Sequence, residues 1–137
     1  MPMALGFDYG LTRIGVATGQ TVTQTASPLT TLRAKDGIPD WQELECLLKE
    51  WTPDVIVVGL PLHQDNTLSE IATRAQKFGN RIHGRYGLSV EYVNEYNTTQ
   101  EARYLLKYRG KSSEQDGVLD TTAACLILER WLGKHYG

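Results

Sequence analysis

The sequence lacks the features of several specialised protein classes. No apolar run approaches the roughly 20 residues of a membrane-spanning helix, and no basic segment followed by an apolar one opens the chain, so we expect a cytoplasmic protein without a membrane partner. Two cysteines, Cys46 and Cys125, lie far apart in apolar helical patterns and are interpreted as reduced core residues. Repeats and linkers are also missing, so the 137 residues are predicted to form a single domain, 1–137.

Net charge is small as well, and its formal value of -2 argues at first against a nucleic-acid partner. The charges are unevenly distributed, because acids outnumber bases by seven in residues 36–70 and bases outnumber acids by five in residues 71–111. The second stretch also holds five of the seven tyrosines. Bases interleaved with aromatics suit phosphate contact and base stacking, although a solvated helix face with core tyrosines would give the same pattern.

Hydrophobic periodicity predicts a mixed order of strands and helices. Expected strands cover 4–8, 13–18, a stretch between 21 and 32, 55–58 and 88–93; expected helices cover 41–51, 67–82, 98–106 and 120–133. Pro28 favours an edge or irregular position for the third strand. Asp40 is the expected N-cap of the first helix, Thr67 to Glu70 form a candidate capping box, and Gly133 is the expected C-terminal stop of the last helix.

Three acidic residues lie at the ends of these elements. Asp8 ends an apolar strand, Glu95 follows the strand 88–93, and Asp120 begins the last helix. The ends of central strands and a covering helix can converge on one crevice, where three carboxylates would bind a divalent metal. Each acid also has a simpler interpretation: Asp8 as a turn residue, Glu95 as a loop carboxylate and Asp120 as an N-cap.

Four segments carry a family resemblance. They are DYGLTRIGVA at 8–17, VGLPL at 58–62, Glu95 followed by two threonines at 98–99, and DTTAA at 120–124. With these motifs in this order, the chain resembles the YqgF family, RuvC-like members of the ribonuclease H superfamily to which Holliday junction resolution and pre-16S rRNA processing are attributed. The resemblance covers almost the whole chain.

The resemblance implies an α/β fold with a ribonuclease H-like, five-stranded mixed sheet and helices on both faces. It also implies that Asp8, Glu95 and Asp120 are catalytic and bind Mg²⁺ or Mn²⁺, with two ions expected, and that Arg13 and the loop 59–61 border the cleft. With the basic stretch included, the residues expected to contact nucleic acid are Arg13, Arg74, Lys77, Arg81, Arg85 and Lys111.

Three positions depart from the family pattern. Asn94 and Tyr96 flank Glu95 where the family has Asp and Arg, which removes one candidate ligand and one phosphate contact. Asn66 replaces a glycine that usually precedes Thr67, and asparagine still tolerates a turn.

The sequence therefore predicts a divalent-metal-dependent nuclease, a hydrolase of phosphodiester bonds in structured RNA. The family resemblance implies that it processes the 5′ end of pre-16S rRNA during ribosome biogenesis. One alternative is a Holliday junction resolvase acting on branched DNA, which would need a homodimer rather than a monomer to make paired cuts. Another is a non-catalytic RNA-binding or transcription-linked factor. An actin-like ATPase, which shares the opening loop, is excluded because it needs two such domains.

Overall fold

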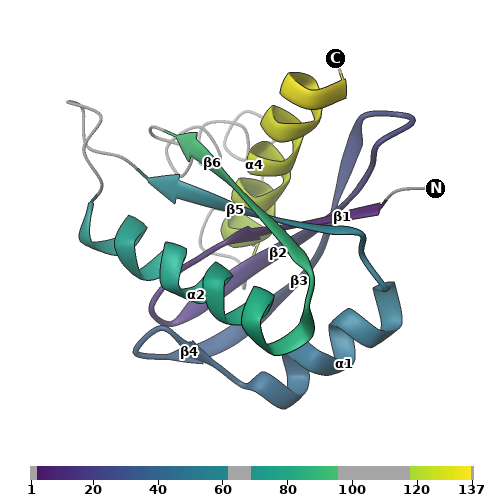
Figure 1. The fold of residues 1–137 in the computed structure, drawn as a ribbon. Coiled ribbons are helices and arrows are strands. Elements are labelled where there is room, and N and C mark those ends of the chain that lie inside the picture. Colours follow the sequence, from purple (N-terminus) through teal and green to yellow (C-terminus); the bar gives the residue numbers. More distant parts are fainter. Residues whose placement is uncertain (1–2, 62–68, 96–117, 137) are drawn as a thin grey trace.

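The computed structural model describes residues 3–61, 69–95 and 118–136, which form a sheet covered by helices on both faces (Figure 1). The strands are β1 Met3–Asp8, β2 Arg13–Gln20, β3 Thr25–Lys35, β4 Ile38–Pro39, β5 Val55–Pro61 and β6 Ser89–Glu95. The helices are α1 Trp41–Trp51, α2 Glu70–Tyr86 and α4 Val118–Tyr136. The helix predicted at 98–106 lies outside the described residues.

The strands form one mixed sheet in the order β4-β3-β2-β1-β5-β6. Strands β1, β2 and β3 are antiparallel neighbours, whereas β5 runs parallel to both β1 and β6. The predicted mixed sheet with helices on both faces is confirmed, but it has six strands rather than five. The additional strand is the two-residue β4, which pairs with Ala34 and Lys35 of β3. The predicted irregularity of β3 is also present, because its register against β2 shifts beside Pro28.

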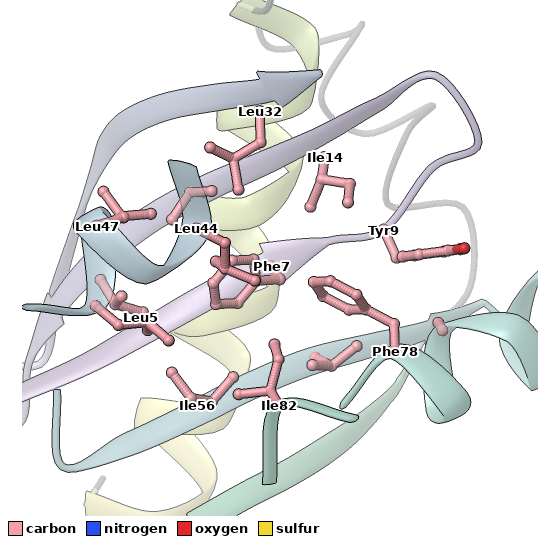
Figure 2. Packing of buried hydrophobic residues seen from close by; sticks show 14 of the residues in the cluster. Leu5, Phe7, Tyr9, Ile14, Leu32, Leu44, Leu47, Ile56, Phe78 and Ile82 are labelled. Carbon is pink, nitrogen blue, oxygen red and sulfur yellow. The ribbon is translucent and has the colours of Figure 1, made fainter. Parts of the chain in front are cut away.

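Side chains of alternate residues along each strand enter two separate cores. Leu5 and Phe7 of β1 pack in the core under α1 and α2, together with Phe78 (Figure 2). Ala4, the neighbour of Leu5 in the strand, packs with Leu128 in the core under α4. A Cβ added at Gly6 would lie 3.0 Å from the Leu128 Cβ, so the absence of a side chain in β1 lets α4 lie close to the sheet.

Helix ends follow the predicted caps only in part. Asp40 is the N-cap of α1, as predicted, and accepts hydrogen bonds from the backbone N–H groups of Gln42 and Glu43. For α2 the capping-box prediction is wrong: the N-cap is Ser69, whose Oγ accepts from the N–H of Ala72 at 3.1 Å. A hydroxyl one residue before the helix satisfies this orphan donor directly.

The last helix and the cysteines also differ from expectation. Helix α4 begins at Val118, so Asp120 lies in its first turn rather than at the N-cap, and it continues through Gly133 to Tyr136. Buried Trp131 and Leu132 hold the turn around the glycine against the sheet, which offsets its low helix propensity. Cys46 is exposed rather than buried, since Leu44, Leu47 and Leu48 are the buried residues of α1; both cysteines are free thiols.

None of the described helices combines the length and the apolar character that a membrane span requires.

Candidate functional site

Asp8 and Asp120 both lie next to Gly15, which brings them to the same place on the sheet. Asp8 ends β1 and pairs in register with Gly15 of β2. A Cβ at Gly15 would collide with the main-chain oxygen of Asp120 and lie 2.9 Å from the Asp120 Cβ. The first turn of α4 therefore rests directly on Gly15, and any larger residue would push Asp120 away from the sheet. Asp8 follows Ala4 and Gly6 in alternation, so it belongs to the same face of β1 that α4 covers.

The Asp120 carboxyl group is held in a partly desolvated place. Its side chain is 24% exposed, and burial raises its pKa above the ordinary value of 3.8. The Arg13 guanidinium, 3.9 Å away and itself 53% exposed, acts in the opposite direction, but the effect of burial on the pKa is larger. The site therefore holds a carboxylate whose charge is only partly compensated within the described part of the chain.

Glu95 ends β6 at the same edge of the sheet. Its main chain pairs with Pro61, the last residue of β5, and β5 lies between β1 and β6. Because β1, β5 and β6 are parallel, their carboxyl ends meet at one edge, where Asp8 also lies. The loop residues predicted to border the cleft, Gly59 to Pro61, form the end of β5 there.

No three His, Cys, Asp or Glu residues are grouped as metal ligands among the side chains that the structure describes. Asp8 and Asp120 are the two members of the predicted set within those side chains, and the Glu95 side chain lies outside them. The proximity of Asp8 and Asp120 follows from the strand register and the packing at Gly15, whereas Glu95 is placed at this edge only by the position of its strand.

The predicted basic face of α2 divides into two parts. Arg74, Lys77 and Arg81 line a hollow of about 210 Å³, together with Tyr9 and the turn 36–38. Arg85 lies instead over the Trp41 ring, with its guanidinium carbon 4.1 Å from the ring centre. Lys111 lies outside the described residues.

Sequence reasoning missed two residues that shape this region. Tyr9 is buried, packs beside Phe78 and donates a hydrogen bond from its hydroxyl to the Gly37 carbonyl at 2.8 Å (Figure 2). Gly15 makes room for Asp120. A glycine inside a predicted strand was the available signal for Gly15, since it often marks a close backbone approach. Nothing in the sequence pattern distinguishes Tyr9 from an ordinary loop tyrosine.

The family model and the similar curated proteins point to the same protein family. Residues 2–134 match the family described as "RuvX: Holliday junction resolvase". The chain is 53% identical over 134 residues to an Aeromonas salmonicida (strain A449) protein named "Putative pre-16S rRNA nuclease", covering 97% of this chain and 96% of that protein. A protein of the same name from Proteus mirabilis (strain HI4320) is 48% identical over 133 residues, covering 96% of each.

Solved structures show the same fold at low sequence identity. Thermus thermophilus RuvC in complex with a Holliday junction substrate matches with a TM-score of 0.56 and 15% identity, covering 100% of this chain and 97% of that one. Fowlpox virus resolvase in complex with Holliday junction DNA matches with a TM-score of 0.55 and 10% identity, covering 96% and 97%. These likenesses establish a RuvC-like arrangement of strands and helices.

Proposed function

The chain belongs to the RuvX (YqgF) family, and from this premise we propose that it is a cytoplasmic nuclease that hydrolyses phosphodiester bonds in structured RNA. Its proposed substrate is the 5′ region of pre-16S rRNA, the RNA for which its similar relatives are named. The observation that carries the proposal is the convergence of Asp8 and Asp120 across Gly15.

The acidic residues suit a divalent cation. Carboxylate oxygens are the ligands that Mg²⁺ and Mn²⁺ prefer, and burial raises the pKa of Asp120, so a bound cation would stabilise its charged form. We assign Asp8, Glu95 and Asp120 as the residues that would hold such ions, with two ions proposed. A bound divalent ion would activate a water molecule and stabilise the charge on the phosphate.

The remaining roles belong to the chain's own side chains. Arg13 begins β2 beside Asp120 and is half exposed, so its guanidinium can contact a phosphate oxygen while it stays close to the carboxylate. The Asp8 main chain pairs with Gly15 of β2, and the preceding residue Phe7 pairs with both β2 and β5, so the carboxylate is presented from a rigid element. A rigid support of this kind keeps reacting groups in a productive geometry.

A cleavage assay tests the assignment. Asp8→Asn removes one negative charge with almost no change in volume, and we expect it to abolish cleavage of pre-16S rRNA in Mn²⁺ while RNA binding in EDTA is retained. Asp54→Asn is the matched control, because Asp54 is an exposed acid just before β5, at the opposite edge of the sheet. Undiminished cleavage by purified Asp8→Asn protein would overturn the assignment, and a wild-type protein that binds RNA without cutting it would favour a non-catalytic factor.

The description of the matching family favours one second candidate, resolution of four-way DNA junctions. The same carboxylates would serve this reaction, but one site cuts one strand, so paired cuts need two copies of the chain. A DNA junction assayed in parallel with the RNA, with sedimentation of the protein at the assay concentration, separates the two functions. Paired junction cuts by a dimer would favour the resolvase, and cleavage of RNA alone by a monomer would exclude it.

A further inference from the structure

Helix α2 contributes three basic side chains to the lining of a hollow on the protein surface. Arg74, Lys77 and Arg81 follow one another at intervals of three and four residues, so they lie on one face of the helix. All three line the hollow, and the other lining residues are Tyr9, Asp36, Gly37, Ile38 and Phe78. Three cations face one carboxylate there, which leaves a net positive charge.

The wall of the hollow is held in place by Arg74 and Tyr9. Arg74 donates from Nη2 to the main-chain oxygen of Asp36 at 2.8 Å, and its Nη1 lies 3.4 Å from Asp36 Oδ1. The Tyr9 hydroxyl donates to the Gly37 carbonyl, and Gly37 has a φ of +79° with no room for a Cβ beside that hydroxyl. The turn 36–38 is therefore tied both to α2 and to the end of β1.

Lys77 and Arg81 remain available to a ligand. Both are exposed, and neither forms an ion pair or hydrogen bond with another residue in the described ranges 3–61, 69–95 and 118–136. Like charges four residues apart on a helix repel each other, so an anion between them would stabilise this face. Exposed Ile38 adds an apolar edge of the kind that a sugar or base can contact.

We propose that Lys77 and Arg81 bind a phosphate group of the nucleic acid in this hollow, separate from the phosphate that is cleaved between Asp8 and Asp120. This proposal rests on the proposed nuclease function, because it concerns a second contact with the same substrate. Tyr9, which forms part of the wall, directly follows Asp8 in the chain, so the hollow lies at the same end of β1 as the carboxylate site but on the other face of the sheet. The phosphate is either a terminal monoester or an internal diester of the strand.

Binding without metal isolates this contact from catalysis. The probes are one single-stranded RNA with a 5′-phosphate and the same RNA with a 5′-hydroxyl, measured by fluorescence anisotropy in EDTA. We expect Lys77→Gln/Arg81→Gln to weaken binding by about tenfold, as the loss of a charge-assisted contact would do. The slope of log K against log salt should become less negative by about 0.7, the value for one phosphate contact on a single strand. The matched control is Lys49→Gln/Lys134→Gln, which removes two exposed charges elsewhere.

The two probes distinguish the sources of the phosphate. A loss confined to the 5′-phosphorylated RNA identifies a terminal monoester, and an equal loss on both RNAs identifies an internal diester; either result supports the proposal. Wild-type protein that binds neither RNA, or a loss no greater than that of the control pair, would overturn it. Because cleavage in Mn²⁺ is measured separately, a wild-type protein that cuts RNA while the double variant binds normally would reject this contact and leave the nuclease function standing.

Discussion

At the scale of single residues, burial of the Asp120 carboxylate opposes folding when no metal ion is bound, because the Arg13 guanidinium offsets only part of the effect of burial. Burial raises its pKa in the folded protein above the ordinary value of 3.8, so the folded state binds the proton more tightly than the unfolded chain does. The stability contributed by this group is therefore greatest in acid and falls as the pH rises from that ordinary value through the raised folded value. At neutral pH, where Asp120 is ionised, its burial destabilises the folded protein by the full amount.

Asp120→Asn should therefore raise the melting temperature at neutral pH in EDTA and make much less difference in acid. The ion pair with Arg13, 3.9 Å long and half exposed, offsets little of this gain, since exposed pairs contribute about 0–1 kcal/mol. Mg²⁺ or Mn²⁺ should raise the melting temperature of the wild type and leave that of the variant unchanged. Calorimetry with and without the metal measures both effects, and a variant less stable than wild type in EDTA at neutral pH would contradict the expectation.

At the scale of elements, two helix caps of similar chemistry differ in what else they touch. Asp40 caps α1 through two backbone N–H groups. Ser69 caps α2, and its hydroxyl also donates to the Pro61 carbonyl at the end of β5, beside the candidate site. The Ser69 hydroxyl thus joins a helix start to the strand end that borders the carboxylates.

Asp40→Ala and Ser69→Ala should each lower the free energy of unfolding by about 0.5–2 kcal/mol, the usual effect of losing a cap. At temperatures where both variants remain folded, we expect Ser69→Ala to reduce the cleavage rate and Asp40→Ala to leave it unchanged. The reason is that the Ser69 hydroxyl, unlike the Asp40 carboxylate, contacts the end of β5. Urea unfolding gives the first quantity and initial cleavage rates give the second. Equal rates for the two variants would show that the contact with Pro61 has no part in the activity.

Much of this element structure could be predicted from the sequence, for identifiable reasons. The β-branched run of β5 and the periodic leucines of α1 are strong local patterns, so the predicted bounds of both elements lie close to the observed ones. Strand β4 has two residues and carries no periodicity. The early start of α4 and its passage through Gly133 depend on packing against the sheet, which a local pattern does not contain.

The candidate site could be predicted less fully, because it depends on contacts between distant residues. The aspartates could be found as charged residues at element ends, and the register of Asp8 with Gly15 brings Asp120 to the same point. The separation of Arg85 from the other basic residues of α2 arises from its stacking on Trp41, which belongs to a different helix far away in the chain. The hollow likewise depends on the hydrogen bond between Tyr9 and Gly37.

At the scale of the whole molecule, one sheet carries two cores. Ile82 lies in the core under α1 and α2, Leu132 lies in the core under α4, and both side chains are fully buried. Along β1 and β5, residues of one core alternate with residues of the other, as Ala4 with Leu5 and Val55 with Ile56, so neither core can separate from the sheet without disturbing its partner.

Leu132→Ala and Ile82→Ala should each lower the free energy of unfolding by about 2–5 kcal/mol and shift a single cooperative transition. Far-UV circular dichroism follows the whole fold, and tryptophan fluorescence combines Trp131 of the α4 core with Trp41 and Trp51 of the other. The two signals should change together in urea. Separate midpoints in either variant would show that the two faces unfold independently.

The alternation of Asp8 and Tyr9 at the end of β1 sets a condition on the shape of the substrate. These neighbours belong to opposite faces of the sheet, Asp8 on the α4 face and Tyr9 against Phe78 on the other. A nucleic acid that reaches both the carboxylates and the hollow must pass around the edge of the sheet, from one face to the other. A DNA double helix, with a persistence length of about 150 base pairs, resists such a bend, whereas a single strand makes it easily. The edge of the sheet would then select for unpaired strand at the point of cleavage.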